Sequence, residues 1–277
     1  MKDILVPVFA LEEDEAALRA AMDLAAKFDA RVIVLVLAIG AASPYADEVA
    51  SLSKVLDDIA EPARSEAASR RAAIAKWLER APVEYEIRDI TVEAALISDE
   101  ILAHARLADL IVITRTRGDE RARRELFSDV LFKSGRPVLL IPPDAPASEN
   151  AWNRIVIAWD AKPQAVRAIA AAMPLLRAAE AVRLVTVDAR PSRSGHGQAP
   201  GSDVAAYLAR RGVRVEVHNV DGLGRSAGRA IADCAVEFGA DVIVMGGYGH
   251  SRAREIVFGG VTRDLVGAST TPLFLAH

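Results

Sequence analysis

The stretch Met245-Gly-Gly-Tyr-Gly-His-Ser-Arg-Ala-Arg-Glu-Ile-Val-Phe-Gly-Gly-Val-Thr262 follows the apolar run Asp241-Val-Ile-Val-Met245. A short apolar run without alternation is typical of a buried strand in a parallel sheet. The glycines after it predict a tight turn at the end of that strand. Because glycine has no Cβ, main-chain N–H groups in such a turn can approach an anion closely. The stretch therefore predicts a buried strand that leads into a phosphate-binding loop.

The same order of elements occurs twice along the chain, since Asp109-Leu-Ile-Val-Ile113 repeats the strand pattern of Asp241-Val-Ile-Val-Met245. In the first copy the patterns predict strands at 4–10, 31–38, 83–89, 109–114 and 137–142, and helices at 13–28, 46–80, 92–107 and 120–134. In the second copy they predict strands at 155–159, 182–188, 213–220, 241–245 and 272–276, and helices at 163–178, 204–211, 226–238 and 255–268. The chain is therefore interpreted as two copies of one unit.

Apolar strands joined by amphipathic helices predict a parallel sheet that is covered on both faces. The fold class is therefore α/β, with two tandem doubly wound, Rossmann-like domains at residues 1–143 and 153–277, each with a five-stranded parallel sheet. A proline-rich linker is expected between them. The last strands of the two copies are apolar sheet edges, which would be a liability if exposed. They are expected to pair within the chain, as an intramolecular pseudo-dimer.

Composition excludes several classes of protein. The 277 residues are 52% hydrophobic, which suffices for substantial cores, and no run approaches the ~20 apolar residues of a membrane helix. Residues 1–150 carry 19 Lys or Arg and 27 Asp or Glu, and residues 151–277 carry 15 and 11. Neither half is basic enough for a nucleic-acid surface. The sequence predicts a cytoplasmic protein with no nucleic-acid or membrane partner, and with the single Cys234 in its core.

The spacing Gly246-x-x-Gly249, nine residues, then Gly259-Gly260-Val-Thr262 resembles the nucleotide-binding signature of the universal stress protein family. The two-copy organisation resembles the tandem members of that family over nearly the whole chain. The resemblance implies a stress-response protein that binds ATP or ADP, with or without Mg²⁺. It implies phosphate and ribose contacts through the main chain at the glycines, a wall from the residues after them, an acidic residue near the adenosine and an apolar contact to the adenine. These residues are, in that order, Gly246, Gly249 and Gly259; Gly260, Val261 and Thr262; Asp160; and Val187.

Two positions of the motif, Gly260 and His250, bear on the strength of phosphate binding. The family pattern has Ser or Thr after the last motif glycine, and Gly260 stands there instead, so one hydroxyl donor to phosphate is lost. A neutral hydrogen bond contributes about 0.5 to 1.5 kcal/mol net, so binding is expected to be weakened rather than abolished, with Thr262 as a substitute donor. His250 is a candidate phosphate donor, and equally a residue that fixes the loop.

The first copy lacks the motif. Its corresponding turn reads Thr114-Arg-Thr-Arg117-Gly118, and Phe127-Ser128 fall at the positions of Gly259-Gly260 when the strands are aligned. The strand at 4–10 also lacks an aspartate where Asp160 stands in the second copy. The first copy is therefore interpreted as a degenerate domain without a nucleotide site. The arginines around Arg123 are interleaved with acidic residues and are interpreted as a solvated helix face.

A second glycine-rich segment lies in the second copy. Gly222-Leu-Gly224-Arg-Ser-Ala-Gly228 follows the third strand of its copy, where a dinucleotide fingerprint would follow the first, so a turn and a helix capped by Ser226 are predicted. No catalytic triad, phosphate-loop lysine or metal-ligand spacing is present in the sequence. The sequence favours a nucleotide-dependent regulatory module, and leaves open a slow ATPase, a nucleotide-free interaction protein and further homodimerisation.

Overall fold

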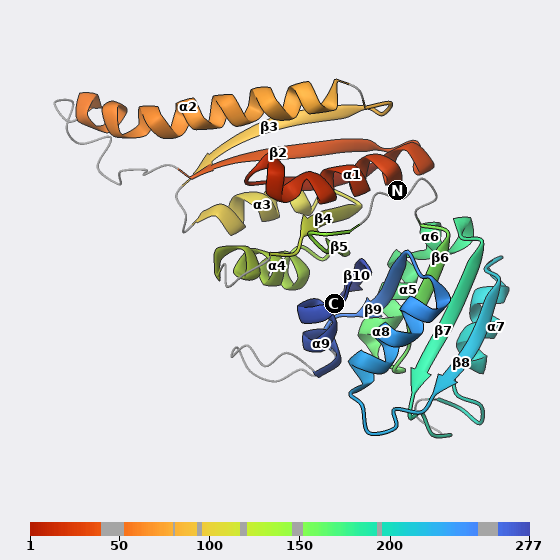
Figure 1. Ribbon diagram of the computed structural model, residues 1–277. Coiled ribbons are helices and arrows are strands. Elements are labelled where there is room, and N and C mark those ends of the chain that lie inside the picture. Colours follow the sequence, from red (N-terminus) through yellow and green to blue (C-terminus); the bar gives the residue numbers. More distant parts are fainter. Residues whose placement is uncertain are drawn as a thin grey trace. The chain divides into compact units, whose positions relative to one another are not determined.

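The computed structural model describes residues 1–39, 53–79, 81–92, 96–116, 121–145, 152–192, 196–248 and 260–277. It divides into two compact units, Met1–Arg136 and Pro137–His277. Each unit is an open sheet of strands with helices packed on it, and Figure 1 shows the elements in sequence colours.

The first unit is built on four strands in the order β3-β2-β1-β4, and the pairs β2–β3, β1–β2 and β1–β4 are parallel. Helix α1 packs on β1 and β4, α2 packs on β2 and β3, and α3 packs against α4. The strands are β1 Asp3–Val8, β2 Arg31–Ile39, β3 Tyr85–Val92 and β4 Leu110–Thr114, and the helices are α1 Leu11–Phe28, α2 Ser53–Leu78, α3 Ile97–Ala105 and α4 Arg121–Lys133.

The second unit holds six strands in the order β5-β10-β9-β6-β7-β8. Strands β10, β9, β6, β7 and β8 are parallel to one another, and β5 is antiparallel to β10. The winding reverses between β6 and β9, so the ends of those strands form the switch point. The strands are β5 Val138–Ile141, β6 Arg154–Ala158, β7 Ala181–Val187, β8 Val215–Val220, β9 Val242–Gly246 and β10 Leu273–Ala276, and the helices are α5 Pro163–Ala171, α6 Met173–Ala178, α7 Ser202–Ala209, α8 Ala227–Phe238 and α9 Gly260–Ala268.

Strand β5 is the last strand of the first sequence repeat, yet it belongs to the second unit. It pairs antiparallel with β10, and Leu140 lies opposite Leu273 while Val138 lies opposite Leu275. Every residue of both strands is buried. The predicted pairing of the two final strands is confirmed, as is the α/β fold with two tandem repeats of five strands each. Antiparallel pairing covers the apolar edge of each strand.

The segment around Gly222 is the capped turn that the sequence predicts. Helix α8 begins after Ser226, whose Oγ accepts the N–H of Arg229 at 3.2 Å. The N–H of Gly222 donates to Oδ1 of Asp188 at 2.9 Å, which fixes the turn before the helix. These glycines therefore shape a turn and a helix start after the third strand of the repeat.

Two predicted boundaries are wrong for identifiable reasons. The helix predicted at 163–178 is divided into α5 and α6, because Pro174 in the first turn of α6 has no N–H and its ring excludes a continuous helix. The helix predicted at 92–107 begins too early, because β3 extends to Val92. There Val92 pairs with Ile39 of β2, and β-branched residues suit a strand.

An aspartate before the fourth strand of each repeat fixes the start of the first strand. Oδ2 of Asp109 accepts the N–H of Lys2 at 2.5 Å, and Oδ2 of Asp241 accepts the N–H groups of Asn153 and Arg154 at 2.7 and 2.8 Å. Partial burial by itself raises the pKa of Asp109, but the main-chain donors outweigh it and hold that pKa below its ordinary value. The ionised carboxylate thus stabilises the native first unit.

We expect Asp109→Asn to remove a pH-dependent part of the stability. A carboxyl group with a lowered native pKa stabilises the fold above its unfolded pKa, near 3.9, and loses that effect as the pH falls through the native pKa. At pH 6 the variant should lose up to about 1 kcal/mol, the scale of a partly exposed charged interaction. Urea unfolding at pH 6 and pH 3 tests this, since the gap to wild type should narrow at pH 3. A gap that is equal at both pH values would contradict the assignment.

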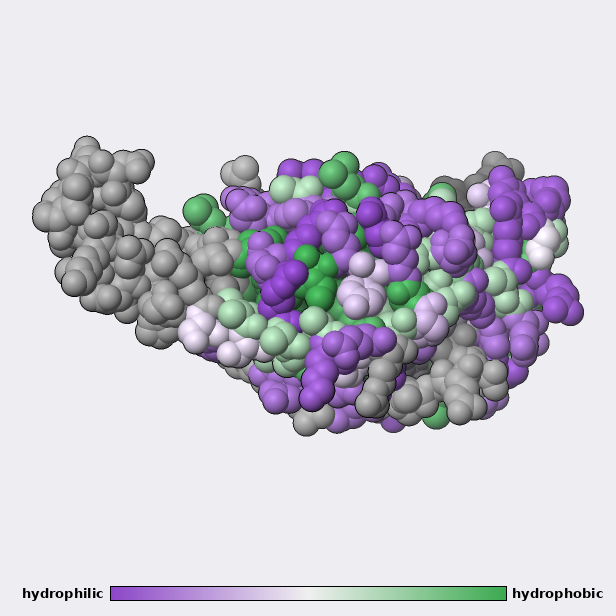
Figure 2. Space-filling view, turned by 90° about the horizontal axis from the view of Figure 1, so that it is seen from above, coloured by the Kyte–Doolittle hydropathy of each residue, from purple (hydrophilic) through white to green (hydrophobic). Residues whose placement is uncertain are grey.

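Hydrophilic side chains cover most of the face shown in Figure 2, and the hydrophobic ones visible there lie in small groups between them. The large exposed apolar residues come from different elements, and Leu107, Leu223 and Val236 are the most exposed. None of the helices in the described ranges has the length and apolar character needed to cross a bilayer.

Candidate functional site

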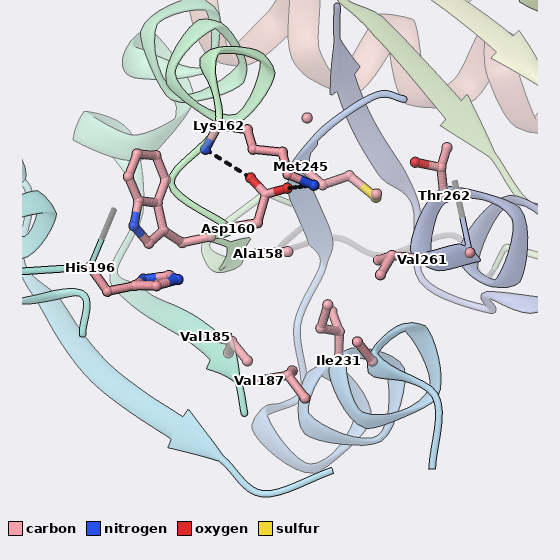
Figure 3. A pocket seen from close by; sticks show the side chains of 14 residues that line it. Ala158, Asp160, Lys162, Val185, Val187, His196, Ile231, Met245, Val261 and Thr262 are labelled. Carbon is pink, nitrogen blue, oxygen red and sulfur yellow. Dashed lines mark hydrogen bonds and ion pairs between the residues drawn. The ribbon is translucent and has the colours of Figure 1, made fainter. Parts of the chain in front are cut away.

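A pocket of about 180 Å³ lies in the second unit at the carboxyl ends of β6, β7 and β9, next to the switch point of the sheet (Figure 3). Its walls come from those strand ends, from the loop before α7, and from the first turns of α8 and α9. The lining residues are Ala158, Trp159, Asp160, Lys162, Val185, Val187, His196, Ala227, Ile231, Met245, Gly246, Gly260, Val261 and Thr262.

The pocket has an apolar side and a polar side. Figure 3 shows the side chains of Val185, Val187 and Ile231 gathered on one side, while Thr262 lies across the pocket from them. Helix α9 begins at Gly260, and the first N–H groups of an α-helix have no intrahelical partner. The partial positive charge of a helix start favours an anion there. The arrangement suits a ligand with a flat apolar part and a negatively charged part.

Asp160 and Lys162 stand together at the end of β6. Oδ1 of Asp160 accepts the N–H of Lys162 at 3.1 Å, and Nζ of Lys162 lies 3.4 Å from Oδ2 (Figure 3). The side chains are 53% and 37% exposed, so this ion pair adds little to stability. A carboxylate offers about four acceptor positions, so Asp160 keeps capacity for the hydroxyl groups of a ligand.

Gly246 is required by packing as well as by the ligand-binding motif. A Cβ at this position would lie 2.6 Å from the N of Ala165 and 2.7 Å from the C of Gln164. Both atoms belong to the main chain at the start of α5, so they cannot rotate away. The glycine therefore allows the end of β9 to approach α5, a role that the motif itself does not indicate.

The main-chain N–H groups of the two residues after Gly246 donate to acceptors inside the protein. The N–H of Gly247 donates to the carbonyl of Ala276 at 2.8 Å, and that of Tyr248 donates to Oγ1 of Thr262 at 3.2 Å. Tyr248 is buried, burial raises the pKa of its phenol, and its φ of 56° is uncommon outside glycine. Since both N–H groups are engaged, the start of α9 is the better source of donors to an anion.

Six of the nine predicted site residues line this pocket: Asp160, Val187, Gly246, Gly260, Val261 and Thr262. Gly249, His250 and Gly259 lie outside the described residues. Oγ1 of Thr262 accepts the N–H of Tyr248, and its O–H remains the donor that is predicted to replace the missing hydroxyl. Sequence reasoning missed Lys162, Trp159, His196 and Ile231 as lining residues. Lys162 and Trp159 are neighbours of Asp160 in the sequence, whereas no motif marks His196.

The first unit carries a buried ion pair at the corresponding strand end. Oδ2 of Asp14 accepts the N–H groups of Phe9 and Ala10 at 2.8 and 3.3 Å, at the end of β1. Nη1 of Arg123 donates to Oδ1 of Asp14 at 2.7 Å, and its guanidinium stacks over the Phe9 ring. Arg123 is 8% exposed and Asp14 is 1% exposed. The interpretation of Arg123 as part of a solvated helix face is therefore wrong.

When the two repeats are compared, the helices that follow the fourth strands, α4 and α9, match with a different residue offset from that of the fourth strands. Ser134 and Ser269 make the same bonds, each accepting through Oγ an N–H two residues later, from Arg136 and Thr271. This match places Glu125 opposite Gly260, three residues from the alignment that the strands predict. The two loops differ in length, and strand patterns do not reveal such a difference. In either alignment a larger side chain replaces the glycine in the first repeat.

Comparison with known proteins agrees with this architecture. The model of the universal stress protein family matches residues 1–135 and 151–277. No curated protein matches the chain. Among solved structures, a universal stress protein from Archaeoglobus fulgidus is similar, with 17% identity, a TM-score of 0.71 and coverage of 99% of this chain and 97% of that chain.

Two further solved structures are similar over nearly the whole chain. One is described as a putative universal stress protein from Pseudomonas aeruginosa, with 14% identity, a TM-score of 0.59 and coverage of 100% and 93%. The other is the cytoplasmic domain of a prokaryotic cation chloride cotransporter, with 14% identity, a TM-score of 0.53 and coverage of 99% and 94%. At these identities the likeness shows the fold alone.

Proposed function

The chain belongs to the universal stress protein family, and we propose that its second repeat binds one adenine nucleotide, ATP or ADP, and acts as a nucleotide-dependent regulatory module. One observation carries the proposal. The motif residues Asp160, Val187 and Gly260–Thr262, which lie far apart in the sequence, line a single pocket with an apolar side and a helix start. The proposal assigns the site to residues 153–277 and no site to residues 1–143.

The chemistry of the pocket suggests how the nucleotide would lie. The adenine would rest on the apolar side at Val187 and Ile231, and the ribose hydroxyl groups would donate to Asp160. The phosphates would accept from the first N–H groups of α9 at Gly260 and Val261. Asp160 is the carboxylate among the lining residues and it faces Lys162, so any Mg²⁺ would be held chiefly by the phosphates.

The buried ion pair supports the assignment of one site per chain. In the first repeat, the carboxylate of Asp14 already accepts the N–H groups at the end of β1, and Arg123 neutralises it. These groups are satisfied inside the protein, so a ligand would have to displace a buried, paired charge. The matching bonds of Asp109 to Lys2 and of Asp241 to Asn153 place Ala165 of the second repeat at the position of Asp14. The end of β6 therefore has no carboxylate at this position, and it lines the pocket.

Mass spectrometry of small molecules released from freshly purified protein, together with calorimetric titration of ATP, ADP and AMP, tests the proposal. We expect about one adenine nucleotide per chain. Val187→Trp should fill the apolar side and abolish binding, whereas Val236→Trp, a matched change at an exposed position of α8, should leave it intact. Absence of binding at millimolar nucleotide would refute the proposal. Slow conversion of bound ATP into ADP would identify the second repeat as a slow ATPase.

We expect Gly260→Ser to strengthen nucleotide binding about two- to tenfold. A Cβ at this position would have no described atom outside its neighbours within 4 Å, and Gly260 has no left-handed φ, so a serine there would clash with none of the described residues. The hydroxyl would add one donor to the phosphates, worth about 0.5 to 1.5 kcal/mol. Titration calorimetry of both Gly260→Ser and Gly260→Ala measures the effect. An equal gain from alanine would show that the hydroxyl is not responsible.

A further inference from the structure

Lys162 lies in the pocket wall at the start of helix α5, where its main chain is fixed. Its N–H donates to Oδ1 of Asp160 at 3.1 Å, and its carbonyl accepts the N–H of Val166 at 3.2 Å. Between Asp160 and Lys162 the chain turns through Ala161, whose φ is 60°. The Asp160 carboxylate thus closes a tight turn of the kind that aspartate side chains favour. This turn sets the point from which the lysine side chain leaves the main chain.

A lysine at this position does not stabilise the helix that it begins. Lys162 is the N-cap of α5, and lysine has no acceptor atom with which to cap the first N–H groups. N-cap positions favour Ser, Thr, Asp or Asn, and the partial positive charge of a helix start disfavours a cation. The ion pair with Asp160 offsets little of this, because both side chains are partly exposed. A bound anion would turn this unfavourable meeting of positive charges into a favourable one.

The ammonium group of Lys162 lies on the side of Asp160 where the phosphates are proposed to bind. Its Nζ lies 3.4 Å from Oδ2 of Asp160, and Figure 3 shows it on the side of that carboxylate toward Thr262. Thr262 belongs to the first turn of α9, which begins at Gly260. Lys162 and Gly260 line the same compact pocket, so a single nucleotide can contact both. Among the described lining residues, Lys162 is the one lysine or arginine.

We propose that Lys162 is a phosphate-binding residue, and that it makes the pocket select a phosphorylated nucleoside over the free nucleoside. This inference rests on the proposed binding of an adenine nucleotide. An ammonium group carries a full charge and three N–H donors, so it can serve the carboxylate of Asp160 and a phosphate together. Without Lys162, the negative charges of the phosphates would face the carboxylate of Asp160 unshielded. The exposed pair with Asp160 is weak, so turning the ammonium group toward a phosphate costs little.

Titration of the full chain with ADP and with adenosine tests the inference, because the two ligands differ by the phosphates alone. We expect Lys162→Gln to lower ADP affinity about ten- to a hundredfold, the range of a hydrogen bond to a charged group, with adenosine affinity unchanged. Added salt should narrow this loss, since salt screens exposed charges. Lys162→Arg keeps the charge and should keep most of the ADP affinity. Lys133→Gln, which removes a lysine paired with Asp129 in the first unit, is the matched control and should change neither affinity.

The outcomes separate the two proposals. If wild type binds ADP and Lys162→Gln binds it equally well, Lys162 does not bind phosphate and this inference is overturned, while the proposed function stands. Equal losses of ADP and adenosine affinity in Lys162→Gln would also overturn it, because they indicate that Lys162 acts through Asp160 or through the shape of the pocket. A loss in Lys162→Arg as large as in Lys162→Gln would show that the charge is not responsible. If wild type binds neither ligand, the proposed function fails and this inference fails with it.

Discussion

Arg123→Met is expected to lower the free energy of unfolding by about 3 to 5 kcal/mol, the usual effect of breaking a buried ion pair from one side. The substitution leaves the carboxylate of Asp14 buried, 1% exposed, without the guanidinium that donates to it at 2.7 Å. Methionine retains much of the packing volume, so the loss comes from the uncompensated charge. Urea unfolding followed by circular dichroism measures it.

Two further variants isolate the cause. Arg19→Met removes the half-exposed pair of Arg19 with Glu15 on α1, and should cost no more than about 0.5 kcal/mol. The double variant Asp14→Leu with Arg123→Met replaces both charges by apolar groups and should recover most of the loss. If Arg123→Met is as mild as Arg19→Met, the buried ion pair is not what holds this strand end together.

Gly246→Ala is expected to destabilise the second unit by about 1 to 3 kcal/mol and to weaken nucleotide binding. The added Cβ would lie 2.6 Å from the main-chain N of Ala165, so β9 or the start of α5 must shift. Overpacking of this kind forces main-chain movement at a cost of that order. Because Gly246 lines the pocket, the shift would also displace the pocket wall. Thermal unfolding and titration with ATP measure the two effects.

Gly267→Ala is the matched control. Gly267 lies near the end of α9, and a Cβ there would have no described contact within 4 Å. The same substitution should be neutral or stabilising by up to about 1 kcal/mol, because alanine favours a helix more than glycine does. A Gly246→Ala variant that remains as stable as Gly267→Ala and yet loses binding would show that Gly246 serves the ligand alone.

The fold could be predicted from local patterns, and six of the residues that line the pocket could be predicted from the resemblance of the motif to a known family. The apolar run before Gly246 predicts a strand. Parallel sheets bind ligands at the carboxyl ends of their strands, so the ligand is expected at the Gly246 end of this strand. Asp160 follows β6, which pairs with β9, and Val187 ends β7, which pairs with β6, so the sheet order brings these residues and Gly246 to one pocket.

The rest depends on contacts between distant residues, which local patterns do not contain. Arg123 has the same sequence surroundings as a solvated arginine, and only its partner Asp14, 109 residues away, makes it a buried one. The packing role of Gly246 depends likewise on the path of α5. His196 belongs to a loop with no periodicity, so its place in the pocket wall required the three-dimensional structure.

The pairing of β5 with β10 makes the protection of an apolar strand edge independent of dilution. Val138 and Leu275 belong to one chain, so they meet at an effective concentration of the order of millimolar, as short connections generally provide. Two separate single-repeat chains would meet only above their dissociation constant. The tandem chain therefore keeps this edge covered even when a cell contains very few copies of the protein.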